Sequence, residues 1–221
     1  MTMIKTNESG RSMIEMLGVL AIIGVLSVGG IAGYSKAMNK FKTNKVADNV
    51  SMIVTNLRTL YAQQNDYNGL NNSTAIQMGV VPDELGTNAM SGTLTNAFQG
   101  GVYIAAAASG NTSAPHKAFV VTMSGLSREA CVSLATNDWG SGYSAGLIGI
   151  HVSGSIVSGP QDTSASASTL QVGCTGTAAA ASGVYACAGG TTQPTPLNVA
   201  QAATACSCGT SNACTITWKF Y

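Results

Sequence analysis

The stretch GRSMIEMLGVLAIIGVLSVGGIAGYSKAM, residues 10–38, contains the pattern that decides how this chain folds. From Met16 to Ser35 it holds 20 residues without a charge. At about 1.5 Å per residue, a helix of that length spans the roughly 30 Å hydrocarbon core of a membrane. Glu15 stands at the edge of this run, where an unpaired carboxylate costs on the order of 3 kcal/mol if it enters hydrocarbon. The stretch therefore predicts a membrane helix with one acidic residue whose presence needs a reason.

Helical periodicity continues beyond this run. Residues at steps of mostly three and four form one face, and they are Tyr34, Met38, Phe41, Val46, Val50, Ile53, Leu57, Leu60 and Gln64. Lysines and other polar residues fill the remaining faces, as on a solvated helix at a membrane surface. Because the first proline is Pro82, we expect one helix from about Ser12 to Gln64.

Five glycines lie within the apolar run, at Gly18, Gly24, Gly29, Gly30 and Gly33. Small residues favour close packing of membrane helices, and paired glycines weaken a helix by about 1 kcal/mol each relative to alanine. We expect a helix that packs against copies of itself and can unwind locally. An ordinary secretory signal has its cleavage site after the apolar core, whereas here a polar leader, residues 1–10, precedes it.

Composition and charge narrow the function classes. The chain has 221 residues, of which 9% are charged, and a formal net charge of +1, so no nucleic-acid partner is implied. No phosphate-binding loop or pair of catalytic carboxylates is evident. Gly142 to Gly146 matches the G-x-S-x-G pattern of hydrolases, with Ser144 as the nucleophile, but no histidine follows Asp162 as the triad order requires. We predict that the protein is not an enzyme and has no cofactor.

The cysteines are even in number and all follow the membrane segment, at Cys131, Cys174, Cys187, Cys206, Cys208 and Cys214. This pattern indicates disulfides formed in an oxidising compartment, which places residues 67–221 outside the cytoplasm. The alternative, a metal held by Cys206 and Cys208, lacks a C-x-x-C pair, and His116 and His151 are isolated from each other. No metal site is predicted.

The rest of the chain predicts a sheet. Strand-like runs occur at 101–105, 118–123, 147–152 and 215–220. A short helix is expected to start at Ser127. Residues 160–205 are predicted to form a long segment made mostly of loops. An antiparallel sheet packed on the outer half of the long helix would cover its apolar face at residues 46–61. No long linker is evident, so the stem and this head are expected to share one folding unit.

The segment from Gly10 to Glu15 resembles the signature of type IV prepilins. The resemblance implies that a prepilin peptidase removes residues 1–10 by cutting after Gly10. It also implies that Arg11 becomes the methylated first residue and that Glu15 stands fifth in the mature chain. Arg11 differs from the apolar residue that the family mostly has there. The apolar run lacks the proline of many type IVa pilins, which favours the type IVb branch.

Two stretches of the head, LSREACVSLATNDWGSGYSAGLIGIHVSG and CSCGTSNACTITWKFY, resemble type IVb pilins of the conjugative thin-pilus sort. The resemblance implies a bridge from Cys131 to either Cys206 or Cys208. Among fifteen possible pairings for six cysteines, we predict Cys131–Cys206, Cys174–Cys187 and Cys208–Cys214. Cys206 and Cys208 are taken to lie in an extended segment, where their side chains point to opposite faces.

Together the resemblances imply an α+β pilin fold, in which the outer half of a long N-terminal helix packs on an antiparallel sheet and the C-terminal region is disulfide-bonded. The expected parts are a cleaved leader (1–10), a membrane and filament-core helix (11–66) and an extracellular head (67–221). The implied function is a structural subunit that moves from the inner membrane into an extracellular pilus filament. Its partners would be other pilin subunits, the prepilin peptidase and the inner-membrane assembly machinery.

Two other functions remain open. A pseudopilin of a type II-like secretion machine shares the N-terminal signature. A membrane-anchored domain that never polymerises is the other alternative, although Glu15 would then be a liability.

Overall fold

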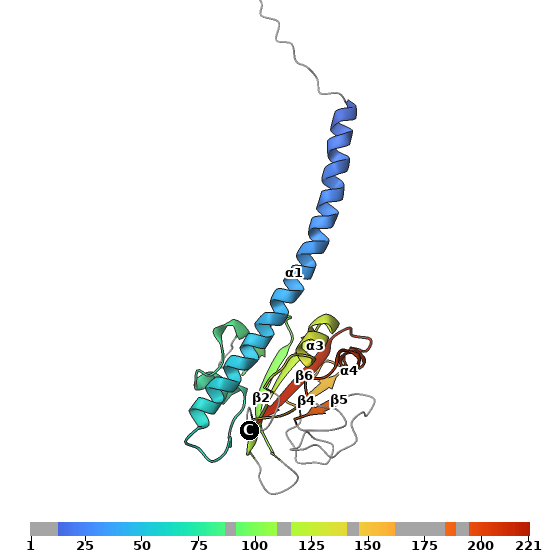
Figure 1. Ribbon diagram of the computed structural model, residues 1–221. Helices are drawn as coiled ribbons and strands as arrows, with labels where there is room; N and C mark the ends of the chain where they lie inside the picture. Colours follow the sequence, from blue (N-terminus) through green and yellow to red (C-terminus); the bar gives the residue numbers. More distant parts are fainter. Residues whose placement is uncertain (1–12, 87–91, 110–115, 141–145, 162–183, 189–194) are drawn as a thin grey trace, which may run out of the picture. The chain divides into compact units, whose positions relative to one another are not determined.

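The computed structural model describes residues 13–86, 92–109, 116–140, 146–161, 184–188 and 195–221 (Figure 1). The chain divides into two compact units, with the boundary between Phe41 and Lys42. The expectation of one folding unit is therefore wrong. The physical reason is that the described side chains before Phe41 are mostly exposed, whereas one face of the helix from Thr43 onward is buried in the head.

Helix α1 spans Met13–Tyr61 and is continuous through Gly29 and Gly30. It ends three residues before the expected Gln64, whose backbone N–H instead donates to the Tyr61 carbonyl at 2.9 Å in a turn. The buried positions on its second half are Thr43, Val46, Asn49, Val50, Ile53, Val54, Leu57 and Tyr61. Leu60 was expected on this face but is 45% exposed, because the step of four from Leu57 leads to Tyr61.

A six-stranded sheet forms the head, in the order β1-β2-β3-β6-β4-β5 with every described pair antiparallel. Its strands are β1 (Leu94–Thr95), β2 (Gly101–Ala107), β3 (Ala118–Leu126), β4 (Leu147–Ser153), β5 (Val184–Cys187) and β6 (Cys214–Phe220). The four expected strands are confirmed as β2, β3, β4 and β6, each somewhat longer than predicted. Strand β5 lies inside the expected loop of residues 160–205, so that expectation is wrong there.

The main core lies between one face of the sheet and the second half of α1, which is drawn in cyan beside the strands in Figure 1. Neighbouring strands place Val121 opposite Trp218 and Ile150 opposite Trp218, so an indole with no exposed surface is enclosed by aliphatic side chains. Burying a large apolar side chain contributes about 1.5–3 kcal/mol. This packing confirms the predicted docking of helix on sheet.

The opposite face of the sheet carries hydroxyl groups and is buried over β3 and β6. The Thr122 and Thr217 hydroxyl oxygens lie 2.9 Å apart across β3 and β6. Residues 155–161 lie over this face, where Thr215 Oγ1 donates to the Ser155 carbonyl at 2.7 Å and the Val157 N–H donates to Ser124 Oγ at 3.1 Å. The buried hydroxyls are thus satisfied by each other and by backbone.

Short helices begin where capping residues predict them. Helix α3 (Arg128–Ala135) starts after Ser127, whose hydroxyl accepts from the Ala130 N–H, as expected. Helix α2 (Asn72–Gln77) and helix α4 (Val199–Ala205) each begin with a capping box, and a 3₁₀ turn covers Asp83–Leu85. Helix α4 also lies inside the expected loop of residues 160–205, so that expectation is wrong there as well. The missed sequence signal is Asn198 followed three residues later by Gln201.

Candidate assembly site

Glu15 lies in the first turn of α1, and its side chain is exposed. A carboxylate in the first turn is stabilised by the positive end of the helix dipole, typically by about 0.3–1 kcal/mol. That contribution is smaller than the cost of placing the charge in hydrocarbon, so position in the helix alone does not explain this residue. Gly10 and Arg11, the expected processing residues, lie outside the described residues, as does Ser144.

The residues on both sides of Glu15 present apolar side chains around the helix. Those with the largest exposed fractions, all 60% or more, are Met13, Ile14, Leu17, Leu20, Ile22, Val25, Leu26, Val28, Ile31 and Tyr34. None of the most apolar part of α1 is buried within the chain, and by length and composition α1 is the one described helix that could cross a membrane. A surface this apolar is stable only in lipid or against other protein.

The glycines of α1 have no side chains and leave depressions in this apolar surface. Among described atoms, nothing lies within 4 Å of a Cβ placed at Gly18, Gly24, Gly29, Gly30 or Gly33. Inside the chain, therefore, none of these positions requires glycine. The helix is continuous through Gly29 and Gly30, and its expected capacity to unwind locally stays a prediction.

Two disulfides join the parts of the head that flank β6. Cys131 in α3 is bonded to Cys206 just after α4, 75 residues later, and Cys208 is bonded to Cys214 at the start of β6. Both pairs agree with the expected pairing. Cys187 is also disulfide-bonded. Its expected partner Cys174 lies outside the described residues, so that pair stays a prediction.

The extended backbone that was expected at Cys206 and Cys208 is wrong. Cys206 ends helix α4 with φ −85° and ψ 41°, and Cys208 has a φ of +54°, so the segment is a turn and not an extended strand. The two side chains still reach different partners because the left-handed residue at Cys208 turns the chain. Backbone contacts add to the link between the helices, since the Leu197 N–H donates to the Ala135 carbonyl at 3.2 Å.

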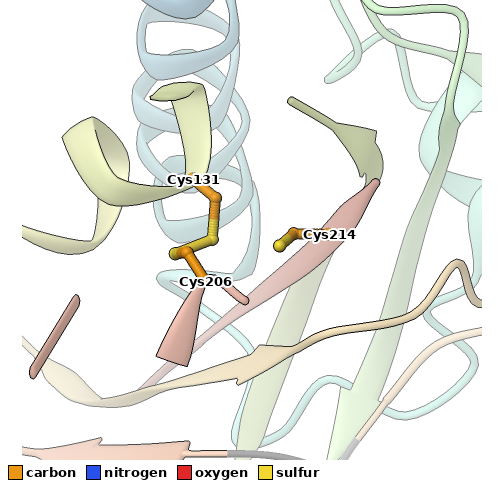
Figure 2. A group of neighbouring side chains, drawn as sticks. All are labelled: Cys131, Cys206 and Cys214. Carbon is orange, nitrogen blue, oxygen red and sulfur yellow. A yellow bond between two sulfur atoms is a disulfide. The ribbon is translucent and has the colours of Figure 1, made fainter. Parts of the chain in front are cut away.

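The sulfur atoms of Cys131, Cys206 and Cys214 lie within 4.8 Å of one another, which is a spacing that metal ligands also adopt. Figure 2 shows that Cys131 and Cys206 are joined to each other, with Cys214 beside them. Cys214 is bonded to Cys208. Metal binding needs thiolates, and sulfurs in disulfides offer none. The arrangement is a pair of adjacent disulfides in a dry interior, since all four residues have no exposed surface.

The histidines are separate features of the head. His151 lies on β4 opposite Thr217 of β6, and burial lowers its pKa to about 4. His116 precedes β3 and accepts a hydrogen bond from the Tyr67 N–H through its backbone carbonyl at 2.7 Å. A histidine that stays neutral between strands is a structural residue. It is not placed as a catalytic base.

Two basic residues of α1, Lys45 and Arg58, make contacts with the rest of the head that the sequence pattern did not predict. Lys45 forms an ion pair with Glu84 at 2.6 Å. The Arg58 guanidinium lies over the Phe220 ring, 5.1 Å from its centroid, and Nε donates to the Tyr221 carbonyl at 3.2 Å. Burial lowers the pKa of Arg58. Arg58 thus ties the end of α1 to the end of β6.

A long N-terminal helix whose second half lies on an antiparallel sheet, with a disulfide-bonded C-terminal region, defines the type IV pilin fold. TcpA, a type IV pilin from the Vibrio cholerae El Tor biotype, has a similar crystal structure, with a TM-score of 0.50 and 19% identity over 81% of this chain and 99% of that one. At that identity the likeness supports the fold alone.

Sequence comparison identifies the family. Residues 40–180, more than half of the chain, match the family model described as PilS N terminal. The major structural subunit of bundle-forming pilus from Escherichia coli O127:H6 is 30% identical over 150 residues, which cover 68% of this chain and 74% of that protein. Toxin coregulated pilin of Vibrio cholerae is 26% identical over 141 residues, covering 60% of this chain and 59% of that protein. This chain belongs to the PilS family of type IV pilins, and such structural pilins are not enzymes.

Proposed function

We propose that this protein is the structural subunit of a type IVb pilus, made as a precursor in the inner membrane and polymerised into an extracellular filament. A prepilin peptidase cuts after Gly10 and frees the amino group of Arg11, which is then methylated. Residues 11–66 form the membrane and filament-core helix, and residues 67–221 form the extracellular head. The inner-membrane assembly machinery then adds the processed subunit to the filament.

The observation that carries this proposal is the apolar surface of α1 from Met13 to Tyr34, which no part of the chain that the structure describes covers. Lipid can cover it in the membrane, and packing against other copies of the helix would cover it once the protein leaves the membrane. The curated relatives are named as pilus subunits, and this supports the same use here.

Glu15 then has a reason to stand beside the apolar run. In a core of packed apolar helices its carboxylate is paired with the positive amino terminus of a neighbouring subunit at Arg11, a charge that exists only after the cut at Gly10. Breaking a buried ion pair costs about 3–5 kcal/mol, because the remaining charge is left without compensation. The pairing therefore favours one axial position of each incoming subunit.

Replacement of Glu15 tests the assembly step. We expect Glu15→Ala to leave membrane insertion and the mass of processed protein unchanged but to lower the yield of sheared filaments by about tenfold or more, given the cost of an uncompensated buried charge. Glu129→Ala is the matched control, because Glu129 is also an exposed acid in the first turn of a helix. Normal filaments from Glu15→Ala would show that the carboxylate has no part in assembly.

Intact-mass measurement of membrane and filament protein tests the processing step. We expect a chain that starts at Arg11 and carries one added methyl group. A chain that starts at Met1, or after Ser35, would contradict the proposed cut. Labelling cells with antibody to residues 70–221 then separates the alternatives. Extracellular filaments support the pilin, whereas abundant processed protein without filaments supports an anchored domain or a pseudopilin.

A further inference from the structure

A cavity of about 480 Å³ lies at the β1–β2 edge of the head. Its walls are the start of α2, the outward side of β1 and β2, and residues 158–160 from the segment that covers the hydroxyl-bearing face. Small-molecule sites in proteins commonly have volumes of about 300–1,000 Å³. We call this cavity the α2–β2 pocket.

One wall is held in place by a single amide side chain. Asn72 Nδ2 donates to the carbonyls of Gly92 and Val102 at 2.9 and 2.8 Å, and its Oδ1 accepts from the Ile104 N–H at 2.7 Å. These bonds fix α2 to the edge of β2. The shape of the pocket is thus set by the protein before any ligand arrives, which reduces the entropic cost of binding.

A tyrosine ring lies along the strand inside this pocket. A Cβ on Gly101 would lie 2.4 Å from the Tyr103 hydroxyl oxygen and 2.8 Å from Cζ, so the ring occupies the space that a side chain at 101 would need. Tyr103 is half-buried, and its strand neighbours Val102 and Ile104 point into the core on the other face. Gly101 therefore lets Tyr103 lie flat and present an aromatic surface in a fixed orientation.

Hydroxyl groups surround this ring. Ser73, Thr95, Tyr103 and Ser158 all line the pocket, and none of their side chains makes a hydrogen bond within the described part of the chain. Ser73 Oγ would lie 2.5 Å from a Cβ on Gly92, so glycine at that position keeps the hydroxyl in the pocket. Each hydroxyl can both donate and accept a hydrogen bond.

The pocket carries no charge, since no Lys, Arg, Asp or Glu is among the described residues that line it. Phosphate and carboxylate ligands would lose hydration there without gaining a cation, and metal ions would find no anionic ligand. A ligand with hydroxyl groups on its edges and C–H groups on a flat face matches both the hydroxyls and the ring.

We propose that the α2–β2 pocket binds a neutral sugar, a mono- or disaccharide whose ring stacks on Tyr103 and whose hydroxyls meet Ser73, Thr95 and Ser158. This site lies in the head and does not depend on Glu15 or on filament assembly. The pilus would then bind glycans directly through its structural subunit.

Saturation-transfer NMR on the full chain, in a zwitterionic detergent without a sugar headgroup, tests this proposal. The probes are glucose, galactose, N-acetylglucosamine, lactose and the anionic sugar glucuronate. We expect saturable binding of at least one neutral sugar and weaker binding of glucuronate. Tyr103→Ala should weaken binding by about tenfold through the loss of the ring surface. Thr95→Val, which keeps the shape and removes a hydroxyl, should weaken it by about three- to tenfold.

Two controls make the result decisive. Thr204→Val removes a hydroxyl from the exposed side of α4 and should leave binding unchanged. Tyr103→Phe keeps the ring and should retain more affinity than Tyr103→Ala. Tryptophan fluorescence shows that each variant is folded, because Trp139 and Trp218 pack with ring centroids 4.9 Å apart in the core. The proposal is overturned if no neutral sugar saturates, if Tyr103→Ala and Thr95→Val bind as the parent chain does, or if glucuronate binds more tightly.

Discussion

Removing the two described disulfides, one at a time, should destabilise the head by unequal amounts. A disulfide restricts the unfolded chain more when it closes a longer loop. The Cys131–Cys206 bridge spans 75 residues and the Cys208–Cys214 bridge spans six. The chain-entropy relation then gives contributions of about 4.5 and about 2.2 kcal/mol at 25 °C. The expected difference is about 2 kcal/mol in the free energy of unfolding.

The variants are two double substitutions, Cys131→Ala with Cys206→Ala and Cys208→Ala with Cys214→Ala. All four cysteines have no exposed surface, so each pair of alanines removes two buried sulfur atoms and leaves a similar cavity. Replacing both partners also leaves no free thiol to attack the adjacent bridge. The difference between the two variants therefore isolates the effect of loop length.

The assay is urea unfolding of the full chain in detergent, followed by tryptophan fluorescence, since Trp218 is fully buried in the head. We expect the first variant to unfold at a clearly lower urea concentration than the second, with similar slopes. Equal losses from both variants would refute the reasoning, because they would show that local packing rather than loop closure sets the contribution. A larger loss from Cys208→Ala with Cys214→Ala would refute it as well.

Two further predictions concern single residues of the head. Because burial lowers the pKa of His151 to about 4, below its unfolded value of about 6.5, the unfolded chain takes up this proton first. Stability should fall by up to about 3 kcal/mol as the pH drops from about 6.5 to 4, and not change from this cause above 6.5. His151→Gln should lessen this loss in unfolding measurements at each pH, while His116→Asn should keep it. Gly100→Ala should destabilise the head by at least about 2 kcal/mol, because its Cβ would lie 1.8 Å from the Ser124 carbonyl oxygen. Gly159→Ala meets nothing within 4 Å and should change the unfolding midpoint little, and equal midpoints would contradict the steric argument.

The strongly periodic elements could be predicted from the sequence. The apolar run after Glu15, the strand-like runs of β3 and β6, and the Ser127 cap of α3 are local patterns, and each gave the correct type of element. The ends of elements were less accurate. Helix α1 ends at Tyr61, where the Gln64 N–H donates to the Tyr61 carbonyl in a turn. No proline or glycine in the sequence marks this end.

Other features depend on contacts between distant parts of the chain. Strand β5 is a strand because Val184–Cys187 pairs with β4, and its four residues contain no long β-branched run. Helix α4 is mostly alanine and small polar residues, so periodicity gave no signal although its capping box did. The α2–β2 pocket is made by residues from 71 to 160, and no spacing in the sequence brings them together.

The sheet order has a consequence for the time at which the head can form. Strand β6 lies between β3 and β4, so the group β1-β2-β3 and the pair β4-β5 are joined through the strand that is synthesised last. Until Cys214–Phe220 has been made, β3 and β4 each have an open edge, and exposed edges promote aggregation. The complete sheet can therefore form only after β6 has been made, when the apolar segment of α1 is already complete. A nascent chain held at the membrane by that segment would be kept apart from its neighbours during this interval.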